Sequence, residues 1–164
     1  MPKAKLTHLD EAGAARMVDV SGKGVTARRA VAQGTVVFSA EAFRLLSANK
    51  LAKGDALAVA RVAGIQAGKR TAELIPLCHT VPLTRLAVVI DLKPRGRVAR
   101  ITATAEAVWS TGVEMEALVA VSAAALALYD MAKAVDRAIS IREIVLLEKS
   151  GGRSGGWRRD RRRP

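Results

Sequence analysis

The sequence predicts an α+β domain in which an antiparallel β-sheet is covered on one face by helices. The chain has 164 residues, which suits a single domain. Apolar residues make up 50% of it and charged residues 26%, so a disordered chain is not expected. From residue 25 onward the pattern runs strand, helix-rich segment, strand, strand, helix, strand, which is the order of a ferredoxin-like fold. We expect one domain over residues 1–155.

A short β extension is expected to precede this sheet. Residues 16–20 (RMVDV) are β-prone. Residues 21–24 (SGKG) should form a turn or mobile loop, because two glycines flank a single cation. Residues 25–38 mix β-branched and polar residues and are expected to form the first long strand.

Two capping residues mark the helix-rich segment. Ser39 is a candidate N-cap for a helix that runs to about Leu51, and Asp55 for a second helix that ends before Pro76. Both side chains can accept hydrogen bonds from the unpaired backbone N–H groups of a first helical turn. Residues 75–82 (IPLCHTVP) are bracketed by prolines and should be irregular.

The second half is predicted to contain a hairpin, a long helix and a final strand. Two β-prone runs, 84–93 and 98–110, are joined by a turn over 94–97. The helix should extend from about 114 to 137, and the strand should cover 139–148.

The long helix is apolar on all sides. From Ala117 to Tyr129 only Ser122 is polar. This run is shorter than the ~20 residues that a membrane span needs, and Asp130 and Lys133 follow at once, so no span is expected. A helix on one face of a sheet exposes its other side. We therefore expect a second copy of the chain to cover it, which makes the protein a homo-oligomer.

The charge is concentrated at the C-terminal end. The net charge is +12, and the last sixteen residues hold seven basic residues and one acidic residue. Arginine-rich ends attract polyanions, but Trp157 is the only aromatic residue there, whereas single-strand binders interleave several. Residues 156–164 are therefore interpreted as a basic, disordered tail. A small RNA- or nucleotide-binding module stays as the alternative function, with nucleic-acid binding not favoured.

Two features of the sequence bear on the cellular compartment of the protein. The N-terminus has no apolar stretch of signal-peptide length. Cys78 is the single cysteine, which excludes an intramolecular disulfide and fits a reducing compartment. A cytoplasmic location is expected.

Asp130 and Lys133 are the first candidates for chemistry. They lie three residues apart, so they share a helix face next to the most apolar stretch of the chain. A partly buried carboxylate and ammonium have shifted pKa values and can exchange protons with a substrate near neutral pH. The alternative interpretation is a surface ion pair worth under ~1 kcal/mol.

Cations beside glycines and a Cys-His pair form the other candidates. Basic residues near glycines can converge on a phosphorylated ligand, because glycine lets backbone N–H groups approach phosphate oxygens. No metal is expected at Cys78 and His79, because the two are adjacent and no further cysteine supplies zinc-ligand spacing.

Several short motifs between residue 6 and about residue 155 occur in an order that is typical of one protein family. The most distinctive are LCH at 77–79, TGVEMEAL at 111–118, YDMAKAV at 129–135 and KSGG at 149–152, with LTH at 6–8 ahead of them. In this order they resemble the molybdenum cofactor biosynthesis protein C family, the cyclic pyranopterin monophosphate synthases. Thr80 stands where that family commonly has a proline, which could alter the loop after His79.

The resemblance implies a cyclising phosphorus–oxygen lyase of molybdenum cofactor biosynthesis. It would convert 3′,8-cyclo-7,8-dihydroguanosine 5′-triphosphate to cyclic pyranopterin monophosphate and release pyrophosphate. The family's ferredoxin-like fold, its hexamer built as a trimer of dimers and its active site at a subunit interface are expected with it. No cofactor is expected, and whether Mg²⁺ assists stays open.

The resemblance also implies site residues. It places the catalytic roles of general base and acid on Asp130 and Lys133. Lysines and arginines would neutralise the triphosphate and stabilise the departing pyrophosphate. The implied substrate-binding residues are Leu77, Cys78, His79, Glu114, Met115, Glu116, Lys23, Arg28, Lys53 and Lys149.

Overall fold

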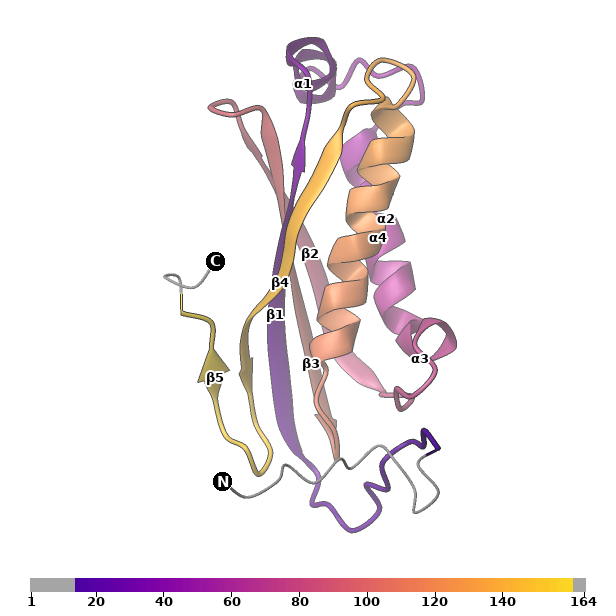
Figure 1. The fold of residues 1–164 in the computed structure, drawn as a ribbon, viewed down its shortest axis with the longest axis vertical. Helices are drawn as coiled ribbons and strands as arrows, with labels where there is room; N and C mark the ends of the chain where they lie inside the picture. Colours follow the sequence, from indigo (N-terminus) through magenta and orange to yellow (C-terminus); the bar gives the residue numbers. More distant parts are fainter. Residues whose placement is uncertain (1–13, 161–164) are drawn as a thin grey trace.

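A five-stranded antiparallel sheet in the order β2-β3-β1-β4-β5 forms the framework of the computed structural model, which describes residues 14–160 (Figure 1). The strands are β1 (Thr26–Val37), β2 (Leu83–Lys93), β3 (Val98–Trp109), β4 (Ser140–Ser150) and β5 (Trp157–Arg158). The helices are α1 (Ala40–Ser47), α2 (Ala56–Lys69), α3 (Thr71–Leu74) and α4 (Glu114–Ala132).

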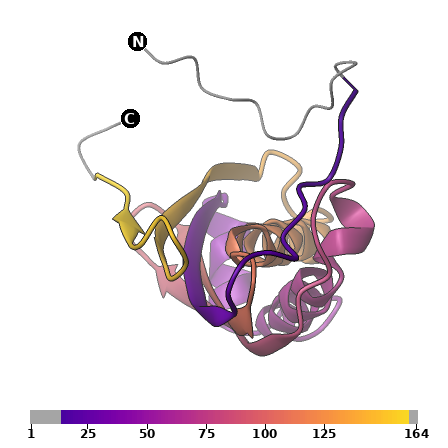
Figure 2. The ribbon, with the colours of Figure 1, turned by 90° about the horizontal axis from the view of Figure 1, so that it is seen from below.

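The connections confirm the ferredoxin-like prediction. The helix-rich segment that contains α2 links β1 to β2, and α4 links β3 to β4, while the paired strands β2-β3-β1-β4 are antiparallel throughout. Such crossovers place both helices on the same side of a sheet. Both views show α2 and α4 side by side against one face (Figures 1 and 2). Within residues 14–160, no helix lies against the other face, which is called the open face below (Figure 2).

Small residues let these layers approach closely. The inward positions of β1 and β3 are mainly alanines with 0% exposure, such as Ala32 and Ala103. A Cβ on Gly64 of α2 would lie 2.7 Å from the carbonyl oxygen of Ala120 in α4. Helix α4 is therefore covered by the sheet on one side and by α2 on another, so α2 does part of the covering expected of a second subunit.

By length and composition alone, helix α4 is long and apolar enough to cross a membrane. More than half of this stretch is buried inside the domain, and the core helix of a folded protein has the same length and apolar composition. Leu126 is its large hydrophobic residue that stays exposed, at 62%.

The predicted caps are confirmed, but the helices are shorter than expected. The Ser39 side chain accepts a hydrogen bond from the Ala42 N–H and Asp55 accepts one from the Ala58 N–H. Helix α1 ends at Ser47 because Asn49 turns into the left-handed region at φ 53°. The second helix breaks at Arg70, and α4 stops at Ala132.

Both terminal predictions need correction. No strand forms over residues 16–20, where an isolated bridge at Ala15 precedes irregular backbone. The Asp19 carboxylate accepts hydrogen bonds from the N–H and hydroxyl of Ser21, and such local bonds compete with strand pairing. The 6–8 motif lies outside the described residues.

The start of the basic tail is a strand, not a disordered segment. In β5, Trp157 pairs with Lys149 and Arg158 pairs with Glu148 of β4. The Arg159 N–H donates to the Leu147 carbonyl at 2.7 Å. Pairing to the β4 edge orders the backbone through these residues, whereas residues 161–164 lie outside the described chain.

Candidate active site

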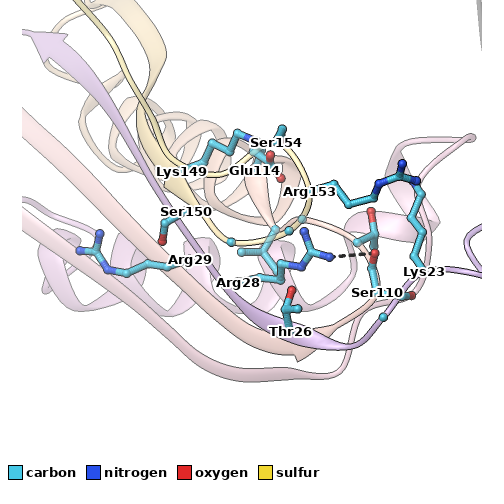
Figure 3. A pocket seen from close by; sticks show the side chains of 16 residues that line it. Lys23, Thr26, Arg28, Arg29, Ser110, Glu114, Lys149, Ser150, Arg153 and Ser154 are labelled. Carbon is cyan, nitrogen blue, oxygen red and sulfur yellow. Dashed lines mark hydrogen bonds between the residues drawn. The ribbon is translucent and has the colours of Figure 1, made fainter.

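A pocket of about 560 Å³ lies where the ends of β1, β3 and β4 meet the N-terminal end of α4 (Figure 3). Its lining includes three of the predicted cations, Lys23, Arg28 and Lys149. Among the described residues that line it, Glu114 is the only acid. The pocket is therefore suited to an anion.

Arg28 is fixed at the floor of this first pocket. Its Nε donates to the carbonyl of Trp109 at 3.1 Å. Its Nη2 donates to the carbonyl of Ser110 at 3.0 Å, the bond drawn as a dashed line in Figure 3. Carbonyl groups carry no charge, so these bonds orient the guanidinium without neutralising it.

Two glycines allow this arrangement. A Cβ on Gly152 would lie 1.8 Å from Nη1 of Arg28, and one on Gly151 would lie 2.0 Å from the Ala27 carbonyl oxygen. Both glycines also have positive φ, which other residues rarely adopt. The KSGG motif is thus needed for the shape of the pocket wall.

A second pocket of about 340 Å³ adjoins the first. The two share Lys23, Thr111, Gly112 and Glu114 in their walls. The remaining lining includes Leu77, Cys78, His79, Met115 and Glu116.

His79 ties the N-terminal segment to the second pocket. Its Nε2 lies 2.8 Å from the carbonyl oxygen of Val18. A carbonyl only accepts, so Nε2 carries the proton and donates it. Val18, Val20 and Lys23 all line this pocket, so the contact helps to hold its outer wall in place.

Glu116 is the titrating group of the second pocket. It is only 4% exposed, and this burial raises its pKa to about 7, with the nearby Glu114 carboxylate adding to the rise. A carboxyl group with such a pKa can accept or donate a proton near neutral pH. Burial and Glu116 also raise the pKa of Cys78, so its thiol stays protonated and is a poor nucleophile.

Glu116 should make stability depend on pH. Its pKa is higher in the folded chain than in the unfolded one, so the folded state binds more protons between about pH 4.5 and 7. The free energy of unfolding should therefore fall as pH rises through this window, by on the order of 2–3 kcal/mol. Urea titrations at pH 5 and 8 should show this fall in the wild type and in the exposed control Glu143→Gln. The fall should vanish in Glu116→Gln, and its persistence there would exclude Glu116 as the cause.

Asp130, Lys133 and Lys53 form a separate cluster at the C-terminal end of α4. The Asp130 carboxylate lies 2.8 Å from Nζ of Lys133 and 2.7 Å from Nζ of Lys53. Hydrogen bonds from Lys133 and then Lys53 lower the pKa of Asp130 to about 2, and the same contact raises the pKa of Lys133. All three side chains are about half exposed, so the partial burial expected for Asp130 and Lys133 does not occur within one chain.

The predicted site residues therefore fall into two groups. Nine of them line the two adjoining pockets at the N-terminal end of α4. Asp130, fourteen residues further along the helix than Glu116, is displaced by about 21 Å along its axis. One chain does not bring Asp130, Lys133 and Lys53 to these pockets.

Residues after the KSGG motif were missed by the sequence reasoning. Arg153 and Ser154 line the first pocket, and Lys149 donates a short hydrogen bond to the Ser154 hydroxyl. The closely spaced glycines from 151 to 156 are typical of a tight hairpin, and predicting that hairpin would have pointed to Arg153 and Ser154 as residues beside the pocket. Among residues 14–160, no group of three or more His, Cys, Asp and Glu side chains is placed to hold a metal ion.

Comparison with known proteins identifies the family. The model of the MoaC family matches residues 17–152. The chain is 58% identical over 157 residues to the cyclic pyranopterin monophosphate synthase of Thermomicrobium roseum, covering 96% of this chain and 95% of the relative. It is also 58% identical over 157 residues to the cyclic pyranopterin monophosphate synthase of Chloroflexus aurantiacus, covering 96% of each chain. A third relative, cyclic pyranopterin monophosphate synthase 1 of Mycobacterium tuberculosis, is 58% identical over 154 residues, which cover 94% of this chain and 90% of the relative. The chain belongs to the MoaC family.

Proposed function

We propose that this protein converts 3′,8-cyclo-7,8-dihydroguanosine 5′-triphosphate to cyclic pyranopterin monophosphate and pyrophosphate in molybdenum cofactor biosynthesis. The observation that carries the proposal is the cationic first pocket adjoining a second pocket with a buried proton-exchanging carboxyl, in a chain of this family. The RNA-binding alternative is not favoured, because the relatives over nearly the whole chain carry the name of a synthase.

The first pocket would hold the triphosphate. Arg28 and Lys149 carry positive charge on a wall shaped by glycine backbone, and Lys23 lies between the two pockets. Closing the cyclic phosphate requires a hydroxyl group of the substrate to give its proton to a base and its oxygen to attack the α-phosphorus, while the bond from that phosphorus to the pyrophosphate oxygen breaks. Fixed cations stabilise the charge that builds up on the leaving pyrophosphate.

The second pocket would hold the base-derived ring. Opening a purine-derived ring and closing it as a pterin moves protons on and off ring atoms. Glu116 can take part because its pKa is near 7. His79 can accept a proton at Nδ1, because its Nε2 already donates to the Val18 carbonyl. Leu77 and Met115 supply apolar walls for a flat ring.

A second copy of the chain would complete the site. Asp130, Lys133 and Lys53 are exposed at the opposite end of α4 from the pockets, so they can reach a substrate held by a neighbouring copy. This supports a homo-oligomer with its active site between subunits, and we extend the proposal to a hexamer built as a trimer of dimers. The family resemblance carries that last step.

The geometry refines the roles of Asp130 and Lys133. A carboxyl group with a pKa of about 2 is ionised at neutral pH, and it holds two ammonium groups beside each other. The raised pKa keeps Lys133 protonated and makes it a weaker acid, so in this arrangement it serves first as a fixed cation, and proton donation requires the bound substrate to lower that pKa. Asp130 positions both lysines in addition to any part it takes as a base.

We also infer a cytoplasmic location. A nucleotide-derived substrate and the free thiol of Cys78 both suit that compartment.

A product assay tests the proposal. The purified chain is supplied with the cyclised guanosine triphosphate, and pyrophosphate and a pterin are measured together. The account predicts that they form in equal amounts. Pyrophosphate without any pterin, or binding of the nucleotide without turnover, would contradict the assigned reaction.

A further inference from the structure

The C-terminal arm, defined as residues 153–159, lies beyond the part of the chain that the family model matches. It nevertheless reaches the first pocket, whose wall includes Arg153 and Ser154 (Figure 3). The Gly155 N–H donates to the Gly152 carbonyl at 3.1 Å, which closes a tight turn around these two residues. The arm is thus part of the pocket wall.

Strand β5 anchors the arm to the sheet. Arg158 forms an ion pair with Glu148 of β4 at 3.0 Å, and Glu148 is in turn paired with Arg29 of β1. Arg29 also faces Glu106 of β3 at 3.5 Å, and Glu106 faces Arg85 of β2 at 3.7 Å. A row of alternating charges therefore crosses all five strands on the open face and ends on β5. This row and the Arg159–Leu147 backbone bond hold the arm against β4.

The charges of the first pocket point to a polyanion that the arm helps to bind. Arg29 is matched by Glu106 and Glu148, so four further cations, Lys23, Arg28, Lys149 and Arg153, line the pocket beside the single carboxylate of Glu114. Figure 3 shows the side chains of Arg153 and Lys23 pointing toward one another. Two like charges that face each other are stabilised by an anion between them.

Ser154 acts on a second cation of the pocket. Lys149 donates to its hydroxyl, which is a neutral acceptor, so the ammonium is oriented and keeps its charge. The arm therefore supplies one cation directly and positions another.

We propose that the C-terminal arm is a polyphosphate-binding element of this site, with Arg153 as a substrate-binding residue and Ser154 as a positioning residue for Lys149. The inference rests on the proposed function for the identity of the substrate, a nucleoside triphosphate derivative. The binding of polyphosphate itself depends only on the pocket.

Two measurements on the full chain test this proposal. Calorimetric titration with inorganic tripolyphosphate gives a Kd, and steady-state kinetics with the cyclised nucleotide give KM and kcat. Arg153→Ala should raise both Kd and KM about tenfold, the effect of losing one charge-assisted hydrogen bond, and should change kcat less than about threefold. Ser154→Ala should raise KM about threefold, and Ser154→Thr, which keeps the hydroxyl, should restore it.

The controls separate the arm from general charge and from folding. Arg95→Ala removes the same charge in the turn between β2 and β3, away from the pocket, and should leave Kd and KM unchanged. A chain ending at Gly156 keeps Arg153 but loses β5, and should raise KM several-fold. Unfolding temperatures should match the wild type for the point variants.

The possible failures are distinguishable. Wild-type Kd and KM in Arg153→Ala would overturn the arm proposal and leave the assigned reaction intact. A wild-type protein that binds no tripolyphosphate would overturn it as well. If the wild type formed no pterin while tripolyphosphate binding still depended on Arg153, the assigned reaction would fail and the arm would stand.

Discussion

Replacing Asp130 with alanine should lower kcat by about a thousandfold while the protein stays folded and still binds tripolyphosphate. The carboxylate is the shared partner of Lys53 and Lys133, so both ammonium groups lose their fixed positions when it is removed. Positioned acid–base groups contribute about 10²–10⁴-fold to a rate. Asp130 is about half exposed, so its loss leaves no cavity in the core. Steady-state kinetics, thermal unfolding and calorimetric titration with tripolyphosphate measure the three parts of this expectation.

Glu41→Ala is the matched control for Asp130→Ala. Glu41 is also an exposed helical carboxylate, paired three residues along with Arg44 at 2.7 Å. Its removal breaks the same kind of ion pair away from the proposed site and should leave kcat at the wild-type value. An Asp130→Ala variant within tenfold of wild type would remove Asp130 from the chemistry.

Replacing Gly152 with alanine should lower kcat/KM by about a hundredfold. The new Cβ would lie 1.8 Å from the Arg28 guanidinium, so either this side chain or the glycine loop must move. Arg28 would then lose its hydrogen bonds to the Trp109 and Ser110 carbonyls, and its guanidinium would no longer point into the pocket. Charged hydrogen bonds of this kind are worth about 1.5–3 kcal/mol, which corresponds to about 10–100-fold.

Gly155→Ala separates the collision from backbone strain. Gly155 also has a positive φ, of 62°, but a Cβ there would meet nothing within 4 Å. It should cost a similar amount of backbone strain and leave kcat/KM within a few-fold of wild type. Equal losses in the two variants would show that loop strain, and not displacement of Arg28, causes the effect.

Much of the fold follows from local rules in the sequence. Ser39 and Asp55 cap their helices as predicted, because a side-chain oxygen before an apolar helical run accepts the first unpaired N–H groups. The Pro94 turn joins two β-prone runs, and the strand order then follows from right-handed crossovers. Where the helices end was less predictable, since Asn49 in a left-handed conformation ends α1 early.

Features that depend on distant contacts were not predictable from local patterns. Strand β5 forms because the β4 edge and Glu148 are there to receive it, although residues 156–164 have the composition of a disordered tail. Helix α4 was expected to need a second subunit along its length, because the sequence did not reveal that Gly64 lets α2 pack tightly against it.

The candidate site shows the same division. The family resemblance named nine residues that the structure brings together in the two adjoining pockets, but it did not name Arg153 and Ser154. The sequence placed Asp130 and Lys133 in a buried setting, yet one chain leaves them exposed at the far end of α4. Helical spacing alone already implied the separation of about 21 Å between Glu116 and Asp130.

The central claim is that each active site combines the two pockets of one copy of the chain with the Asp130 cluster of another copy. Mixing of variant subunits tests this claim most directly. Asp130→Ala is mixed in equal amounts with the double variant Arg28→Ala His79→Ala, each nearly inactive alone, and the subunits are dissociated and reassembled. Random pairing should create intact sites from the undamaged halves and restore about a quarter of wild-type turnover. Activity that stays at the average of the two parent variants would contradict a site shared between subunits.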